Sequence, residues 1–285
     1  MNTIDPHDLL IIFLPVLIFE SSFSADVFVL AKSKYQLMLL AGPGALGTAV
    51  ILGFSLLYIF GYGYGNDLTI PQGLAIGAVL STTDPVSVVA LLKEIGANVK
   101  FNVLLEGESH FVDGTAMVMF LVTLDIVESG EFSFLDSTLM FFRLVIGGTL
   151  FGLLVGYLLT FWFVRIRKDN TLVILITFVT SYGVFFVSEI YFEISGTLAL
   201  VAMGLYLGPF VRSHFKHETQ HSMHTVWGFA FFTLETVIFV ITGTFIGEVI
   251  YEFEHDDYET TNLDFVKAGL FYLFVMLIRL IVLFI

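Results

Sequence analysis

The sequence predicts an all-α polytopic membrane protein. Of its 285 residues, 57% are hydrophobic and 13% are charged, whereas a soluble globular chain carries about 25% charged residues. Most of the chain divides into apolar segments of about 20 residues, the length that an α-helix needs to cross a bilayer. The connections between these segments alternate between basic and acidic along the chain.

Nine segments have the length and hydropathy expected of membrane spans, and we treat 1–285 as one transmembrane domain. The spans are expected at residues 9–30, 36–60, 70–93, 101–127, 139–164, 172–192, 196–211, 224–250 and 265–285. The seventh is short for a complete crossing. The start of the chain lacks the basic region and the small-residue cleavage site of a signal peptide.

The charges of the connections predict an orientation. Connections after odd-numbered spans are basic, such as Lys32 and Lys34 after the first, whereas the last even-numbered connection, 248–264, holds seven acids and no base. The positive-inside rule then places residue 1 outside and residue 285 in the cytoplasm. Arg143 and Lys267 are exceptions. The net charge of −14 therefore indicates an acidic outer surface, and no nucleic acid partner is expected.

The first two spans differ in their polar content. Glu20 falls near the middle of 9–30, which Pro15 is expected to kink. A carboxylate at the bilayer centre costs about 2.5–3.5 kcal/mol on insertion scales and indicates a functional site, although Glu20 could also be a structural hydrogen-bonding group. Span 36–60 has no ionisable group. The small residues around Pro43, including Gly42 and Gly47, predict a kinked scaffold helix packed closely on a neighbour.

The third span is predicted to break at Thr83, Asp84 and Pro85. Proline lacks a backbone donor and disfavours helix at the preceding residue, and a broken helix at membrane depth needs protein or a water-filled cavity around it. The break leaves free carbonyls that could bind a cation. Asp84 could cap the second half-helix or contact the ion, and the two roles are compatible.

The fourth span has the densest cluster of polar groups. Ser109 and Asp113 are four residues apart and share a helix face, with His110 beside them. Glu108 faces a different direction, and Glu106 is expected to be solvated near the cytoplasmic end. Asp113, with Ser109 and backbone carbonyls, could bind a dehydrated sodium ion. A single carboxylate that holds either a proton or a sodium ion is the simplest chemistry of exchange.

The remaining spans contribute scaffold and two further ionisable groups. Glycines in 139–164 favour close packing, so this span and 172–192 are interpreted as scaffold or dimer surface. Glu235 lies at mid-depth in 224–250 and needs a partner or a proton. Arg279 lies in an otherwise apolar segment and requires a counter-ion. Glu108 is the predicted counter-ion; alternatively, Arg279 extends to the cytoplasmic surface.

Several segments together resemble the cation/proton antiporter family that includes the sodium/proton exchangers, closest to its plant salt-tolerance and sperm-type branch. The resemblance covers about 9–285. It rests on FLPVLIFESSF at 13–23, STTDPVSVVALLKEIGA at 81–97, EGESHFVDGTA at 106–116, SGTLALVAMGLYLG at 195–208, LETVIF at 234–239 and IRLIVLF at 278–284.

The resemblance implies an inverted-repeat fold with two crossing broken helices, assembled as a homodimer. It implies a plasma-membrane secondary antiporter, not an enzyme, that exchanges sodium or another monovalent cation for protons and regulates pH without a cofactor. It also implies particular roles. Asp113 exchanges the ions, Ser109, Glu20 and the Thr83 backbone line the cation site with support from Asp84, and Glu108 pairs with Arg279.

Two departures from the family pattern qualify these expectations. Val112 stands where the family usually has asparagine; valine adds no charge, so electroneutral exchange is expected, with His110 and Glu235 as modulators. The family also has spans before residue 9 and after residue 285, so a fragment truncated at both ends is expected. The main alternative is a non-transporting or degenerate regulatory relative. An intramembrane hydrolase is disfavoured, because no catalytic aspartate motif is evident.

Overall fold

The structure is a computed structural model that describes residues 6–60, 68–82, 86–129, 134–166, 169–255 and 262–284. Within these ranges every regular element is helical. Six of the helical segments are long and apolar enough to cross a membrane, fewer than the nine expected, and they support a multi-pass membrane protein. The elements are α1 Pro6–Ser24, α2 Val27–Lys32, α3 Lys34–Leu39, η1 Leu40–Gly44, α4 Ala45–Phe54, η2 Ser55–Ile59, α5 Ile70–Leu80, α6 Val86–Glu94, α7 Val99–Ser129, α8 Phe134–Ile166, α9 Asn170–Phe186, η3 Val187–Tyr191, α10 Gly196–His214, α11 His217–His255 and α12 Asn262–Phe284, where η denotes a π-helical turn.

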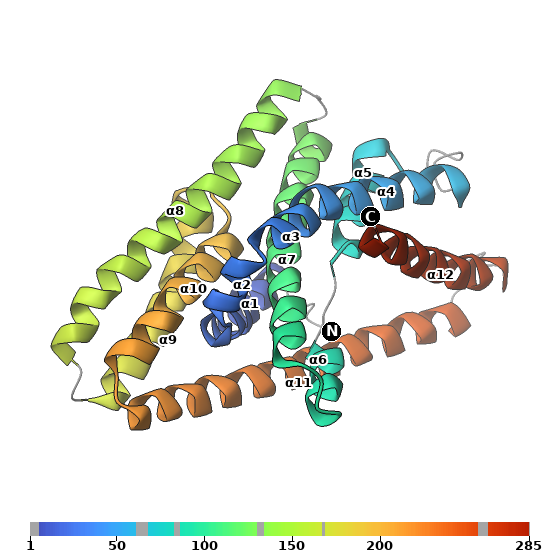
Figure 1. Cartoon of the computed structure of the whole chain (residues 1–285). Coiled ribbons are helices and arrows are strands. Elements are labelled where there is room, and N and C mark those ends of the chain that lie inside the picture. Colours follow the sequence, from blue (N-terminus) through green and yellow to red (C-terminus); the bar gives the residue numbers. More distant parts are fainter. Residues whose placement is uncertain are drawn as a thin grey trace.

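Figure 1 shows how these helices are arranged. α8, α9 and α10 lie together at one side, α4, α5 and α12 lie at the other, and α7 runs between the two groups. The long helix α11 runs beneath both groups and connects α10 to α12. α7 packs against both α5 and α8, so its polar residues lie where the two groups meet.

The first predicted span consists of two helices rather than one. α1 contains Pro15 and ends at Ser24, and α2 begins at Val27. Asp26 causes the restart, because its Oδ1 accepts hydrogen bonds from the backbone N–H groups of Phe28 at 3.0 Å and Val29 at 3.4 Å. Such capping satisfies donors that have no partner within a new helix.

The break predicted in the third span is confirmed. α5 ends at Leu80 and α6 begins at Val86. At the end of α5, the Ser81 hydroxyl donates to the carbonyl of Ala78 at 2.7 Å, and the Thr82 hydroxyl donates to the carbonyl of Val79 at 2.9 Å. These bonds fix the last turn of α5, while the carbonyls of Ser81 and Thr82 themselves point beyond the helix.

The seventh segment, expected to be short for a crossing, continues to His214 as α10 and is long enough to cross a membrane. It is the most enclosed of the six segments of that length. Within its most apolar window 67% of the residues are buried, compared with 0% for α11. The glycines of α8 explain this enclosure: a Cβ at Gly148 or Gly152 would collide with the carbonyl oxygens of Ser195 and Ala199. The predicted close packing of 139–164 is therefore confirmed, with α10 as the neighbour.

Close packing in the second span occurs at a different position from the one expected. A Cβ at Gly42 or Gly47 would meet no atom within 4 Å, so that part of the prediction is wrong. The close contact lies further along, where Gly53 of α4 and Gly77 of α5 let the two backbones touch. Pro43 lies instead in η1, a π-helical turn that absorbs the missing proline donor.

Trp227 of α11 anchors the core of the α1–α9–α10 group. It is 0% exposed, stacks on Phe178 with ring centroids 3.9 Å apart, and lies 4.6 Å from the ring of Phe19. Its Nε1 donates to the Thr177 hydroxyl at 3.1 Å, which satisfies the one polar atom of the indole. α11 is thereby fixed to the bundle near its N-terminal end.

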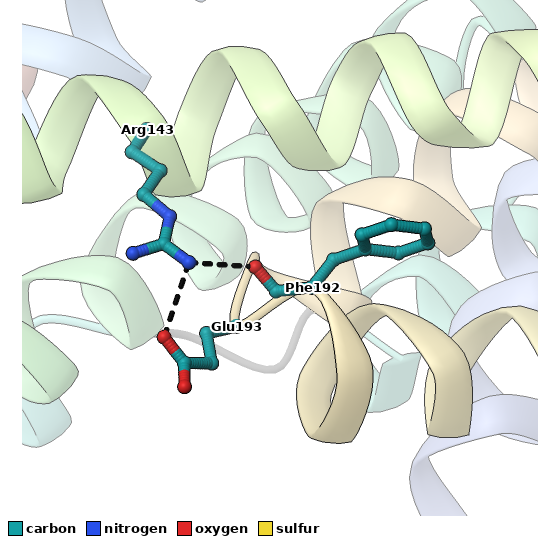
Figure 2. Close-up of polar contacts among 3 residues, drawn as sticks. All are labelled: Arg143, Phe192 and Glu193. Carbon is teal, nitrogen blue, oxygen red and sulfur yellow. Dashed lines mark hydrogen bonds and ion pairs between the residues drawn. The ribbon is translucent and has the colours of Figure 1, made fainter.

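Arg143, an exception to the charge pattern, joins α8 to the connection between α9 and α10. Figure 2 shows its Nη2 donating to the carbonyl of Phe192 at 2.9 Å and contacting the Glu193 carboxylate at 3.1 Å. Glu193 has a φ of 49°, a left-handed conformation that allows the sharp turn into α10. A local clamp thus explains a basic residue at the predicted outer end.

Candidate functional site

The candidate site forms where α7 passes the broken end of α5 and the C-terminal part of α12. Arg279 of α12 donates from Nη1 to the carbonyl of Thr82 at 3.1 Å and from Nη2 to the carbonyl of Ser81 at 3.2 Å. Two carbonyls that the helix break leaves without helical partners therefore bind a guanidinium group. Arginine suits this position because it presents several donors in a fixed planar arrangement.

Arg279 also interacts electrostatically with the two acids of α7, Glu108 and Asp113. The sequence predicted only Glu108 as its partner. The carbonyls of Ser81 and Thr82 were missed, although a lone intramembrane arginine and a helix break both indicate groups in need of partners. Arg279 thus connects the break to both acids, and the role of the Glu108–Arg279 pair remains a prediction.

Ser109 and Asp113 lie together on α7, as their spacing predicts. The Ser109 hydroxyl donates to Oδ2 of Asp113 at 3.3 Å. Ser109 is 3% exposed, and Asp113 is half-buried. A hydroxyl and a carboxylate at this distance offer oxygen atoms of the kind that hard cations prefer.

A cavity of about 30 Å³ lies against α7 at Glu108 and Val112, the residues that immediately precede Ser109 and Asp113 in the chain. Its volume is enough for about two water molecules. Four of its lining residues are polar, and each comes from a different element: Thr48 of α4, Ser81 at the end of α5, Glu108 of α7 and Arg279 of α12. Its lining residues are Leu40, Gly44, Ala45, Thr48, Ser81, Glu108, Val112 and Arg279.

The second predicted span contributes to this cavity, although the sequence indicated only scaffold. Thr48 of α4 lines it, and its hydroxyl donates to the carbonyl of Gly44 at 2.8 Å. Val112 of α7 lines the cavity too and packs against Ala41 and Ala45. The residue that departs from the family pattern therefore borders the same space as Glu108 and Arg279.

Glu20 lies on α1, where it accepts a hydrogen bond from the Ser24 hydroxyl at 2.7 Å. The adjacent residue, Ser21, is hydrogen-bonded through its backbone to the imidazole of His110. The turn of α1 that carries Glu20 therefore touches the turn of α7 that follows Ser109. The structure brings these two predicted site segments together, and ion binding by Glu20 remains a prediction.

His110 and Glu106 form a second polar pair on α7. Within the described parts of the chain, the buried Nε2 of His110 has no hydrogen-bond partner. Glu106 is half-buried and interacts electrostatically with the imidazole, so it is less exposed than a fully solvated side chain. The contact arises because residues four apart share a helix face.

The other predicted site residues lie apart from this cluster or outside the described ranges. Glu235 is half-buried on α11, which packs against α1, α9 and α10. Thr83 and Asp84 lie outside the described residues, so their roles stay predictions. Across the described ranges no three histidine or acidic side chains are grouped to hold a metal, so a sodium site at Asp113 would draw on hydroxyl and backbone oxygens.

Comparison with known proteins identifies what the chain resembles. The family profile described as sodium/hydrogen exchanger, transmembrane, matches residues 1–285. Sodium/hydrogen exchangers 7 and 8 of Arabidopsis thaliana are each 35% identical to this chain over 282 residues, which are 99% of this chain. The Na(+)/H(+) antiporter ApNhaP of Aphanothece halophytica is 34% identical over 245 residues, or 84% of this chain.

These relatives are much longer than the chain. The matched region covers 24% and 36% of the two Arabidopsis proteins and 45% of ApNhaP. Among solved structures, the sodium proton antiporter MjNhaP1 of Methanocaldococcus jannaschii superposes with a TM-score of 0.64 at 19% identity, over 78% of this chain and 55% of that one. This last likeness establishes the fold.

Proposed function

Because the chain belongs to the transmembrane sodium/hydrogen exchanger family, we propose that it forms the ion-exchanging part of a secondary antiporter. The exchange is of sodium, or another monovalent cation, for protons across a membrane. Members of this family are transporters rather than enzymes. Since the chain spans about a quarter to a half of the curated relatives it matches, transport by this chain is the proposal to be tested.

The observation that carries the proposal is the pairing of Ser109 with Asp113 beside a helix break that Arg279 holds. A carboxylate at membrane depth is costly to bury. A bound proton or a bound cation lowers this cost by neutralising the carboxylate, which cannot hold both at the same time. Binding of sodium would therefore release the proton, which is the chemistry of exchange.

The remaining charges favour electroneutral exchange. Arg279 interacts with Glu108 as well as with Asp113, so one fixed positive charge is balanced by one fixed carboxylate. Val112 adds no second titrating group beside Asp113. One proton then exchanges for one monovalent cation at Asp113, with the Glu20 turn of α1 and the Thr83–Asp84 segment completing the site.

The first test replaces the exchanging carboxylate. In proteoliposomes that contain a pH-sensitive dye, a sodium gradient should drive proton flux, and Asp113→Asn should abolish it, because an amide exchanges no proton. The control is Asp125→Asn, which lies on the same helix and is exposed; it should retain wild-type flux. Flux that survives Asp113→Asn would refute the assigned role.

The same assay tests electroneutrality. With the membrane potential clamped by potassium and valinomycin, the rate should not change between inside-negative and inside-positive vesicles. A rate that follows the potential would show that charge moves and would require a second titrating group.

The alternative function is that of a non-transporting regulatory relative, and the observation that favours it is Val112. Valine leaves the wall of the cavity beside Glu108 and Arg279 apolar at this position. If the wild-type chain transports poorly, Val112→Asn should increase the flux several-fold, because an amide at this position can hydrogen-bond the neighbouring polar groups. Absence of flux in both proteins would support the regulatory function.

We also propose the assembly and location that the family resemblance implies. The protein acts as a homodimer in the plasma membrane, with residue 1 outside and residue 285 in the cytoplasm, and its exchange regulates pH. The exposed faces of α8 and α9 offer a surface for the second copy. Cross-linking in native membranes would test this assembly.

A further inference from the structure

A cluster of histidines lies far from the candidate ion site, where α10 ends and α11 begins. Four of the seven histidines occur between residues 214 and 224. His217, His221 and His224 are spaced four and three residues apart, so they share one face of α11, and all three are exposed. The opposite face of this segment is buried through Thr219, Met223 and Trp227.

The cluster lies beside Arg212 of α10, which binds the backbone at the end of α1. Arg212 donates from Nη2 to the carbonyl of Ala25 at 2.7 Å and from Nη1 to the carbonyl of Ser24 at 3.5 Å. His224 interacts electrostatically with both Arg212 and His221. Its ring lies 5.6 Å from that of Phe23. Histidines and arginine thus form one patch.

Hydrogen bonds hold this patch in a defined conformation. Nε2 of Gln220 donates to the carbonyls of Arg212 at 3.0 Å and Phe215 at 2.8 Å, which fixes the turn between α10 and α11. The Thr219 hydroxyl donates to Oδ1 of Asn170 at 2.6 Å, which ties α11 to the start of α9. The basic side chains therefore stand on an ordered surface rather than on a mobile tail.

The charges that act on His224 are the positive ones of Arg212 and His221. Acids lie on the neighbouring elements as well: Asp26 and Asp169 cap α2 and α9, Glu20 accepts a hydrogen bond from Ser24, and Glu218 of α11 is exposed. Further basic groups near these helix ends are Lys216, His214 and Arg165. The N-terminus of α11 adds a partial positive charge. Each histidine that gains a proton is therefore repelled by its neighbours.

An independent observation places this end at the membrane surface. Trp162 is 64% exposed on α8 and precedes the basic residue Arg165 by one helical turn. Exposed tryptophans gather at the level of the lipid headgroups. The histidine patch at the adjoining helix ends therefore lies within reach of those headgroups.

We propose that Lys216 and the histidine face of α11, beside Arg212, bind the anionic phospholipid headgroups of the adjoining leaflet more tightly as the pH falls. Anionic leaflets attract basic groups near their surface, and histidine is the side chain whose charge ordinarily changes between pH 5 and 8. An anionic headgroup relieves the repulsion among the protonated histidines, so acidification strengthens the contact. The contact does not depend on the ion-exchange activity.

The test uses the purified chain in detergent with dansyl-labelled phosphatidylserine. Trp162 lies three residues before Arg165, and Trp227 lies three residues after His224. Energy transfer from these tryptophans to the dansyl group therefore reports lipid binding at this end of the protein. We expect the affinity to be about ten-fold higher near pH 5.5 than near pH 7.5, as for a few added surface charges. Dansyl-phosphatidylcholine should show little transfer and no pH dependence.

Variants separate the pH-dependent binding by the histidines from the pH-independent binding by Lys216. The triple substitution His217→Gln, His221→Gln and His224→Gln should lose the pH dependence and keep the weaker binding at pH 7.5. Lys216→Gln should lower affinity at both pH values. His255→Gln, at the other end of α11, is the matched control and should behave as wild type.

Two outcomes would overturn the proposal. One is a pH dependence that persists in the triple variant. The other is displacement of the labelled lipid by millimolar inorganic phosphate, which would indicate a site for the free anion rather than for a lipid surface.

Discussion

Arg279 shows at the scale of single residues how an intramembrane charge can be satisfied by several groups at once. Its guanidinium binds two backbone carbonyls of the broken helix and interacts with Glu108 and Asp113. The carbonyls are neutral acceptors, so they satisfy its hydrogen-bond donors, while the carboxylates balance its charge. Hydrogen bonding and charge compensation at this residue therefore come from different elements, α5 and α7.

A double-mutant cycle at Glu108 and Arg279 tests this division. Arg279→Gln should lower the free energy of unfolding by about 2 kcal/mol, less than the 3–5 kcal/mol lost when one partner of a fully buried pair is removed, because both groups are only half-buried. The double variant with Glu108→Gln should be more stable than additivity predicts, by about 1 kcal/mol. Denaturation in detergent micelles measures all three variants.

Additive effects in that cycle would mean that Arg279 is held by the Ser81 and Thr82 carbonyls alone. The predicted ion pair with Glu108 would then be wrong, even though the two groups border the same cavity.

Glycines determine the packing at the scale of helices. In α8 they face α10, and in α4 and α5 they face each other. Without a hydrophobic driving force between helices inside a bilayer, close backbone approach is a main source of association. The two glycine contacts therefore define two tightly packed pairs, α8–α10 and α4–α5, on either side of α7.

Gly152→Ala is expected to separate the α8–α10 pair. The added methyl group would collide with the Ala199 carbonyl, and overpacking of this kind costs about 1–3 kcal/mol. Gly183→Ala in α9 is the control, since a Cβ there would meet nothing within 4 Å; it should be neutral or slightly stabilising. Thermal unfolding in detergent compares them, and equal midpoints for the two variants would contradict the role of the glycine contact.

The elements themselves were predictable from the sequence to a large extent, but their neighbours were not. Apolar length located helices in all nine expected segments, and Pro85 located the break between α5 and α6. The number of spans was less well predicted, because only six helical segments in the described ranges are long and apolar enough to cross a membrane. Hydropathy could not indicate that the segment α10 is the most enclosed, because lipid and protein interior are equally apolar. Spacing paired Ser109 with Asp113, whereas Thr48 and the carbonyl partners of Arg279 depend on contacts distant in sequence.

At the scale of the whole molecule, α11 is the longest helix that the structure describes. Its 39 residues correspond to about 58 Å at 1.5 Å per residue, well beyond the roughly 30 Å of hydrocarbon. We therefore predict that its two ends reach water on opposite sides of the membrane. This holds even if the helix is tilted by a moderate angle.

The absence of cysteine allows a direct test of that orientation. Single substitutions Glu218→Cys and Glu248→Cys place a thiol near each end of α11, both at exposed positions. A membrane-impermeant maleimide should label Glu248→Cys in intact cells and Glu218→Cys only in inverted vesicles, as the charge pattern predicts. Labelling of both thiols from one side would contradict a membrane-spanning α11.

The contacts of Arg279 also set the order in which the chain can complete its fold. Arg279 and Thr82 are 197 residues apart, so at about 5–20 residues per second roughly 10–40 s of synthesis separate their emergence from the ribosome. During that time the carbonyls at the end of α5 have only water or temporary partners. The polar centre of the protein is therefore among the last parts to be completed, after the helices around it are already in the membrane.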